Sequence, residues 1–320
     1  MELYSNILEN NKCLKCDGAY TMKVKGIFLH SVGCAQPKAS VFMKMWNDPT
    51  LTIGVHGIID GLTGAVYQCL RWDMPGWHAG DGDPITSPTC VGNKYYIGVE
   101  MCEPAEIKYT TGGKFTVTNL AKAKETATRT YNAAVELFAM LCRTYGLNAL
   151  NTDVIMSHSE GHKKGIASNH GDPEHLWKGL GLPYDMNKFR SDVYAKMCAE
   201  NKKSTGEVYR VRKSWNDTKT HLGTFLVLDD AVHCQKNNPS FNVYNKSGVK
   251  VYPNYIYTKV NYVIKTTAPN GVSIYTGPDE NLKANKTTGR GAFTVIEECN
   301  GFGRLKSGAG WVMLSKVTKL

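Results

Sequence analysis

Residues 157–177, SHSEGHKKGIASNHGDPEHLW, hold four of the nine histidines of this chain. The side chains in this stretch that could do chemistry are His158, His162, His170, His175 and Asp172. Imidazole and carboxylate groups can bind a metal ion, transfer protons, or simply lie on a solvated loop. The cluster alone leaves these three alternatives open, so the elements that would position it must be considered.

Two histidines stand where an apolar, strand-like run ends. His30 closes the run IFLH, and His158 follows VIMS. Asp172 lies 14 residues beyond His158, across a loop that contains glycines. Two imidazoles and one carboxylate form a known ligand set for catalytic zinc, which leaves a fourth position for water. Spacing therefore favours a zinc hypothesis, in competition with packed or solvated histidines.

Two other chemical interpretations fit the cluster poorly. His158 and His162 have the spacing of a zincin helix, but the glutamate takes the second intervening position rather than the first. Gly161 between them also weakens a helix there. Cys34 and Cys102 could act as nucleophiles, but both follow strand-like runs, and nothing in the sequence would lower their pKa.

Composition limits the classes of partner. The chain has 320 residues, 42% hydrophobic and 21% charged, which is ordinary for a globular protein of about two domains. No apolar run approaches the roughly 18 residues needed to span a bilayer. The net charge of +10 favours an anionic partner, yet the lysines are dispersed and no nucleic-acid-binding motif is present. We expect no nucleic-acid partner and no membrane insertion.

The first residues and the cysteines bear on the compartment. The start, MELYSNILENNKCLKCDG, has acidic and amide side chains where a signal peptide needs a basic and then an apolar stretch. We expect synthesis in the cytoplasm without a signal peptide. The ten cysteines are scattered, and several lie in apolar runs, so a disulfide framework is not expected. Cys13 and Cys16 form the one close pair, and zinc there would need two more ligands.

Apolar runs and helical periodicity alternate through the first 200 residues. Strands are predicted at residues 25–33, 51–60, 64–70, 95–102 and 153–158. Helices are predicted at residues 119–145, with Gly146 as the C-cap, and at 186–200. Such an arrangement predicts a sheet covered by helices, in the α/β or α+β class.

The second half has a different character. Residues 199–207 are polar and read as a linker, after which 207–215 is strand-like, 221–237 helix-like and 241–253 a hairpin. From residue 260, short β-rich runs alternate with glycine turns, which favours a small β-barrel. No paired acid, base or metal set occurs there, so we expect a binding role. The predicted units are residues 1–200, a linker at 201–206, a small α+β segment at 207–253 and a barrel at 258–320.

Four stretches carry a family resemblance: KGIFLHSVG, WHAGDG, YYIGVEMCEP and the histidine-rich segment. In this order they resemble the zinc-dependent N-acetylmuramoyl-L-alanine amidases, which include phage endolysins, bacterial autolysins and peptidoglycan recognition proteins. The resemblance covers roughly residues 1–200 and implies a mixed central β-sheet flanked by helices. It implies His30, His158 and Asp172 as zinc ligands. Recognition proteins that only bind peptidoglycan lack the third ligand, so Asp172 favours an enzyme.

The same resemblance implies catalytic roles for two further residues. Glu100 takes the position of the glutamate that accepts a proton from water and returns it to the leaving amine. His170, two residues before the third ligand, takes the position of the group that stabilises the oxyanion. The bond cleaved would be the amide between the lactyl group of N-acetylmuramic acid and L-alanine.

The remaining aromatic and histidine residues have less specific interpretations. His78 and Trp77, in GWHAGDG, are predicted to contact substrate, with a loop role for His78 and a core role for Trp77 as alternatives. His56 is interpreted as a buried histidine with satisfied hydrogen bonds. His162 and His175 are interpreted as loop and helix-surface residues.

The second half resembles wall-binding modules. Residues 207–253 resemble one half of a sporulation-related (SPOR) repeat, and 260–320 resemble a bacterial SH3 domain. The sequence therefore predicts a monomeric, zinc-dependent, bacteriolytic enzyme whose partner is peptidoglycan. It would act on the cell wall after release, most simply as a phage or prophage endolysin released through a holin. A host autolysin, a wall-recycling amidase and a non-catalytic peptidoglycan-binding protein are the alternatives.

Overall fold

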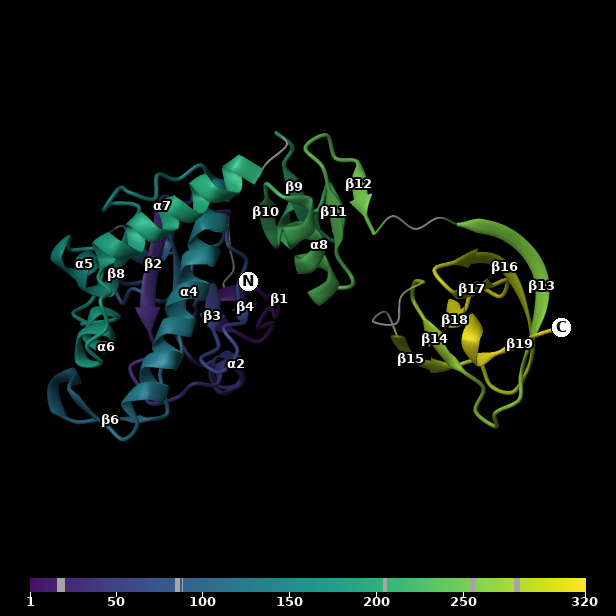
Figure 1. Ribbon diagram of the computed structural model, residues 1–320, viewed down its shortest axis with the longest axis horizontal. Coiled ribbons are helices and arrows are strands. Elements are labelled where there is room, and N and C mark those ends of the chain that lie inside the picture. Colours follow the sequence, from purple (N-terminus) through teal and green to yellow (C-terminus); the bar gives the residue numbers. More distant parts are fainter. Residues whose placement is uncertain (16–20, 84–86, 88, 204–205, 254–256, 279–282) are drawn as a thin grey trace.

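The computed structural model describes residues 1–320 except 16–20, 84–86, 88, 204–205, 254–256 and 279–282. Figure 1 shows a larger part in which helices cover a sheet, a small segment beside it, and a separate β-rich part at the C-terminus. Among the described residues, no helix combines the length and apolarity that crossing a membrane requires.

The first part is built on a six-stranded mixed sheet in the order β1-β4-β3-β5-β2-β8. The strands are β1 Leu3–Ser5, β2 Gly26–Ser31, β3 Gly57–Ile59, β4 Val66–Gln68, β5 Tyr96–Met101 and β8 Ile155–Ser157. β2 pairs in parallel with both β5 and β8, whereas β3 and β4 are antiparallel. The predicted mixed α/β class is confirmed. β3 is shorter than the predicted strand 51–60, because Gly54 instead bonds to Trp77 outside the sheet.

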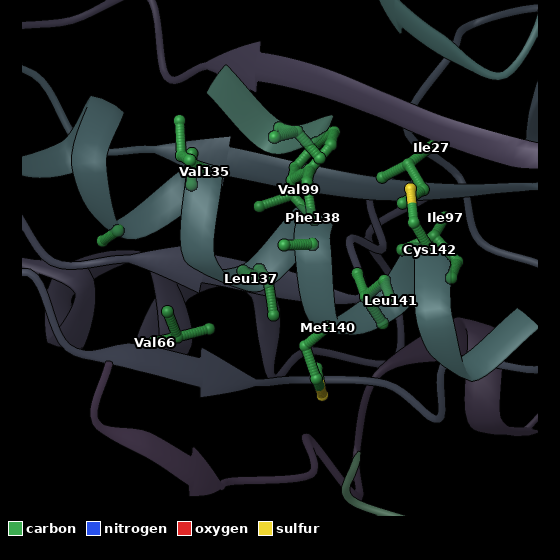
Figure 2. Close-up of a cluster of buried hydrophobic side chains, with 14 of the residues drawn as sticks. Ile27, Val66, Ile97, Val99, Val135, Leu137, Phe138, Met140, Leu141 and Cys142 are labelled. Atoms are coloured by element: carbon green, nitrogen blue, oxygen red, sulfur yellow. The ribbon is translucent and has the colours of Figure 1, made fainter. Parts of the chain in front are cut away.

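A long helix covers one face of this sheet. α4 runs over Leu120–Tyr145, as predicted, with the Asn119 side chain capping its start and Gly146 at φ 65° closing it. Its apolar stripe, including Phe138 and Leu141, packs on Ile27, Ile97 and Val99 of the sheet (Figure 2). α7 (Met186–Lys203) packs against α4 and extends three residues beyond the predicted end.

Shorter elements complete the first part. α2 (Ala39–Trp46) packs against Ile58 of β3, whereas the next residue of that strand, Ile59, packs on the α4 side. Because successive side chains of a strand point to opposite faces, α2 covers the face of the sheet that α4 leaves open. The others are α1 Lys12–Lys15, α3 Gly92–Tyr95, α5 His158–Lys163, α6 Glu174–Gly179, and the hairpin β6 Ile107–Tyr109 with β7 Phe115–Val117.

The middle segment is a four-stranded antiparallel sheet with one helix, in the order β10-β9-β11-β12. Its elements are β9 Tyr209–Arg212, β10 Gly223–Phe225, α8 Leu228–Asn237, β11 Asn242–Tyr244 and β12 Lys250–Tyr252. The predicted hairpin is confirmed. The predicted helix over 221–237 is wrong in its first part, because residues 223–225 pair with β9 before the helix begins.

This segment shares a hydrophobic core with the first part. Val211, Leu222 and Phe225 belong to the same cluster of buried side chains as the residues of α4. The Trp72 indole donates to the carbonyl of Leu222 at 3.0 Å. The Asn238 side chain accepts from Ser5 N and donates to Leu3 O, which fastens α8 to β1. The two are therefore joined by packing as well as by the chain.

The C-terminal part is an antiparallel sheet of seven strands in the order β15-β14-β18-β17-β16-β13-β19. They are β13 Thr258–Thr266, β14 Ser273–Tyr275, β15 Lys283–Thr287, β16 Gly291–Cys299, β17 Phe302–Leu305, β18 Trp311–Met313 and β19 Thr318–Lys319. It has a core of its own, formed by Ile264, Val295, Leu305 and Val312. Its likeness to an SH3 domain stays a prediction.

Candidate metal centre and catalytic groove

The parallel strands β2 and β5 bring two predicted site residues side by side. His30 lies directly opposite Glu100 in their register. Side chains alternate across a strand, and Leu29 and Val99 face α4, so His30 and Glu100 point to the other face. β8 pairs with β2 on its other side, and His158 follows at the same edge. Three predicted site residues therefore meet at the carboxyl ends of neighbouring parallel strands.

His158 is the first residue of α5 rather than the last of a strand, and its position is fixed by the start of this helix. Ser157 and Glu160 form a reciprocal capping box. The Glu160 carboxylate is held by both terminal nitrogens of Arg190 at 2.9 and 3.0 Å. Gly161 is required because a Cβ there would lie 2.3 Å from the Phe28 ring.

His30, His158 and Asp172 converge. His30 Nδ1 lies 3.1 Å from His158 Nδ1 and 3.3 Å from Asp172 Oδ2, and His158 Nδ1 lies 3.7 Å from Asp172 Oδ1. Tetrahedral zinc with bonds of about 2.0–2.1 Å separates its ligand atoms by about 3.3 Å. These buried residues, which we call the metal triad, could hold a metal ion.

His78 fixes the tautomer of His30. Its Nε2 lies 2.9 Å from the carbonyl of Tyr96, which can only accept, so Nε2 carries the proton. His78 Nδ1 then accepts from His30 Nε2 at 3.1 Å, which leaves the lone pair of His30 Nδ1 for the metal. Burial, and to a smaller extent the nearby His30, lowers the pKa of His78 far below its usual value, which keeps this ring neutral.

Both ring nitrogens of His78 are therefore engaged inside the protein. The ring still borders the groove, so the contact of His78 with substrate stays a prediction, and it would involve the ring carbons rather than the nitrogens. Gly98 makes this arrangement possible, because a Cβ there would lie 2.3 Å from His78 Cγ. Sequence reasoning missed this role, because nothing in the local pattern shows that the loop folds back over β5.

A second relay runs from His158 to His170. His158 Nε2 lies 3.1 Å from Ser168 Oγ, which lies 3.0 Å from His170 Nδ1. His158 Nε2 also lies 3.2 Å from His170 Nδ1. With its Nδ1 in the metal triad, His158 can donate from Nε2 to the hydroxyl, and the hydroxyl can then donate to His170. Burial, and to a smaller extent the nearby His30, lowers the pKa of His158 to about 4, so this ring is neutral at neutral pH. His170 is exposed at the groove.

Glu100 presents a free carboxylate oxygen beside the metal triad. Its Oε2 is buried and has no hydrogen-bond partner among the described residues. Burial, with Asp172 and Glu103 nearby, raises the pKa of Glu100 well above its usual value. A carboxylate with a raised pKa and an unused lone pair is suited to accept a proton.

The triad lies in the floor of a groove with two arms, which are cavities of about 630 and 680 Å³. Both are lined by His78, Glu100, His158 and His170. The first arm also contains Trp77, with Lys12 Nζ 5.2 Å from its ring centre, and the apolar Ile53. The second is bordered by Tyr109 and the glycines between β6 and β7. The groove can therefore hold an extended substrate on both sides of the triad.

A buried cluster in the second arm corrects one prediction. Tyr109 OH lies 2.7 Å from Glu103 Oε2 and 2.6 Å from His175 Nε2. His175 is therefore a partner in the groove wall and not a plain surface residue. Glu103 is fully buried, and burial raises its pKa despite the Tyr109 hydrogen bond. The spacing of these residues gave no signal that they would meet.

The remaining predictions concern His56, His162 and the Cys13–Cys16 pair. His56 is buried, donates to Met74 O at 2.7 Å and accepts from Gly98 N at 2.9 Å, which confirms its interpretation as a satisfied histidine. His162 is exposed, but it lies in α5 and not on a loop as predicted. Cys16 lies outside the described residues, and Cys13 is buried.

Comparisons with known proteins concern this same part of the chain. Residues 20–175 match a family model described as N-acetylmuramoyl-L-alanine amidase. The amidase CwlH of Bacillus subtilis is 34% identical over 89 residues, which are 27% of this chain and 33% of that protein. This chain thus spans about a third of the length of that curated relative.

Solved structures give weaker likenesses. Hydrolase AmiA of Staphylococcus aureus, in complex with its ligand, has 15% identity and a TM-score of 0.46, over 64% of this chain and 87% of that chain. A mutant endolysin from Bacillus subtilis has 20% identity and a TM-score of 0.38, over 60% and 99%. The family match is therefore the main comparison for this chain, and its residues 20–175 are a little under half of the 320 residues.

Proposed function

We propose that this protein is a zinc-dependent N-acetylmuramoyl-L-alanine amidase that cleaves bacterial peptidoglycan between N-acetylmuramic acid and L-alanine. The observation that carries this proposal is the convergence of His30 Nδ1, His158 Nδ1 and the Asp172 carboxylate. Beside them lies Glu100 Oε2, which has no hydrogen-bond partner among the described residues. This arrangement lies inside the segment that matches the amidase family.

The donor set fits zinc. Two neutral imidazoles and a carboxylate are preferred ligands of Zn²⁺, and three protein ligands leave one position open. The second nitrogen of each histidine is held by His78 or Ser168, as is usual for metal-binding histidines. When bound, zinc would polarise the scissile carbonyl and lower the pKa of water.

The protein's own residues supply the proton transfers. Glu100 would accept a proton from the attacking water at its free oxygen and return it to the nitrogen of the leaving L-alanine. His170, held through Nδ1 by Ser168, would present Nε2–H to the carbonyl oxygen as negative charge develops. The two arms of the groove would hold the glycan and the peptide.

Metal content and product formation test this proposal together. The parent should contain about one zinc per chain and release peptides with free L-alanine amino groups from purified walls. Asp172→Ala should lose both properties while its circular dichroism stays near that of the parent. A fully metal-loaded, active Asp172→Ala protein would show that the triad is assigned wrongly. A metal-loaded parent that binds walls and releases nothing would support the non-catalytic alternative.

We further propose that the protein acts as a phage or prophage endolysin, with a host autolysin as the rival. The support is an amidase domain combined in one chain with two smaller units, which we propose to be SPOR-like and SH3-like wall-binding modules. Expression in a susceptible bacterium should leave cells intact until the membrane is permeabilised. Lysis of intact cells without permeabilisation would contradict release through a holin.

A further inference from the structure

A cavity on the far side of the amidase domain has the chemistry of an anion site. It has a volume of about 340 Å³ and lies between the end of α4 and the middle segment. We call it the seam cavity; its polar lining includes Asp73, Arg143, Tyr145, Arg210, Arg212 and His221. None of its lining residues borders the catalytic groove. α4 ends at this cavity, and the chain then enters the start of β8. The far end of β8 leads to His158, so the cavity lies at the opposite ends of the strands from the metal triad.

The charges around the seam cavity do not balance. Asp73 is paired with Arg71 at 3.0 Å, and Arg143 is paired with Glu200. Arg210 and Arg212 have no carboxylate within ion-pair distance among the residues that the structure describes. Asp217 and Asp73 act on Arg212 only from a longer range. Two positive charges are therefore left over, side by side on one face of β9.

The hydrogen-bond donors are in excess as well. Arg212 uses Nε on His221 Nδ1 and Nη1 on Trp215 O, and no described acceptor takes its Nη2. The Arg210 guanidinium lies over the Trp215 ring, at 5.7 Å, and has no hydrogen-bond acceptor among the residues that the structure describes. The Arg143 side chain is 9% exposed, and its Nε and Nη1 have no partner in the described part of the chain. Buried donors without acceptors are rare in folded proteins, and they indicate a missing acceptor.

His221 does not add to the charge. It accepts a hydrogen bond from Arg212 and lies 3.1 Å from Thr224 Oγ1. Burial, and to a smaller extent the charges of Arg212 and Arg210, lowers the pKa of His221 to about 3. The excess is therefore set by two guanidinium groups, whose planar forks match phosphate and carboxylate oxygens. A phosphate carries up to two negative charges at neutral pH, whereas a carboxylate carries one.

We propose that the seam cavity is a phosphate-binding site, with Arg210 and Arg212 as its principal ligands. The phosphate could be free or could belong to a phosphate-bearing polymer of the cell wall. The site is separate from the catalytic groove, so this proposal can hold whether or not the proposed amidase activity does.

Titration of the full-length protein with inorganic phosphate, at constant ionic strength, tests the site. Calorimetry should show saturable binding to one site that weakens at least tenfold in Arg210→Gln. Arg210→Lys should weaken phosphate binding less than Arg210→Gln, because lysine keeps the positive charge although it lacks the planar guanidinium. The matched control is Lys219→Gln, which removes one exposed charge from the same segment outside the cavity lining and should bind like the parent. Zinc content and cleavage of soluble muropeptides should be unchanged in all three.

A second arm of the experiment identifies the source of the phosphate. Binding to purified walls is compared before and after chemical removal of wall phosphate. If removal weakens the parent but not Arg210→Gln, the ligand is the wall polymer; if both bind as before while inorganic phosphate still binds, the ligand is free phosphate. The proposal is overturned if phosphate shows no saturable binding, or if Arg210→Gln and Lys219→Gln bind it equally.

Discussion

At the scale of single residues, the site separates groups that would hold zinc from groups that would move protons. The metal triad is buried, and burial lowers the pKa of His158 to about 4, which keeps that ring neutral. Glu100 and His170 lie beside the triad. Glu100 Oε2 has no hydrogen-bond partner among the described residues, and the His170 ring is exposed. Different substitutions should therefore give different defects.

Glu100→Gln and His170→Ala should keep zinc and lose turnover. Each would act on charge that develops during the reaction, so kcat should fall about 10²–10⁴-fold while the zinc stoichiometry stays near that of the parent. Steady-state kinetics on a soluble muropeptide, with metal analysis of the same samples, measures both. Either variant isolated without metal would instead be missing a ligand.

His78→Phe should weaken zinc binding rather than turnover. It keeps an aromatic ring but removes the acceptor that holds His30 Nε2, so zinc affinity should drop about 10–100-fold. Competition with a chelator gives the dissociation constant. His162→Phe, at an exposed histidine of the same region, is the control and should bind zinc like the parent. Equal affinities in the two variants would remove His78 from the positioning role.

Buried neutral histidines should make the fold sensitive to acid. The pKa of His56 is lowered to about 4 and that of His221 to about 3, mainly by burial. The unfolded chain binds these protons near pH 6.5, so it holds more protons than the folded chain below that pH. The free energy of unfolding should therefore fall as pH drops from 6.5 towards 4, by up to about 1.4 kcal/mol per unit for each histidine.

Denaturant titrations of metal-free protein at several pH values measure this slope. His221→Gln should have a shallower slope than the parent over the same range. An unchanged slope would mean that His221 is protonated in the folded state.

At the scale of elements, alternation along parallel strands builds the site. The β-branched runs of β2 and β5 made their positions predictable, and alternation places His30 and Glu100 on one face. The contributions of His78, Ser168 and His175 were not predictable. His78 and Ser168 depend on loops that fold back across the groove, and His175 depends on how α6 lies against β6. β10 was missed because its apolar residues continue into α8 without a turn signal, and only pairing with β9 makes them a strand.

Gly161 tests how tightly α5 is packed. In an exposed helix, Gly→Ala stabilises by about 1 kcal/mol. Here the new methyl group would meet the Phe28 ring, so Gly161→Ala should destabilise the protein by about 1–3 kcal/mol. Lys163→Ala, on the exposed side of the same helix, should change stability by less than about 0.5 kcal/mol. A stabilised Gly161→Ala protein would contradict the close packing of α5 on β2.

At the scale of the whole molecule, the chain combines one extended hydrophobic core with a separate β-rich part. The polar stretch at 199–207 predicted a boundary, yet the middle segment buries Val211, Leu222 and Phe225 in the core of the first part. Sequence could not show this, because the packing joins residues far apart in the chain. β13–β19 have a core of their own.

Two truncations distinguish these relationships. A chain that ends at Pro253 should keep zinc and cleave soluble muropeptides at close to the parental rate. A chain that ends at Glu200 should be destabilised by several kcal/mol, because Trp72, Met140 and Leu3 lose apolar cover or hydrogen-bond partners. Thermal unfolding and zinc content measure both. Equal stability of the two truncated chains would show that the middle segment folds independently.

The β-rich C-terminal part is proposed to raise wall affinity through effective concentration. The chain ending at Pro253 should therefore sediment poorly with purified walls and lyse them slowly, although its active site is intact. Complete sedimentation of this shorter chain with walls would place the anchor elsewhere.

The bond that the protein cleaves can be identified by mass spectrometry of purified walls after incubation with the zinc-loaded protein. We expect peptides that begin with a free L-alanine amino group, together with glycan strands whose muramic acid lactyl groups end in free carboxylates. These products should be absent with Asp172→Ala. Glycan fragments with new reducing ends, or peptides cut between other residues, would contradict the proposed amidase activity.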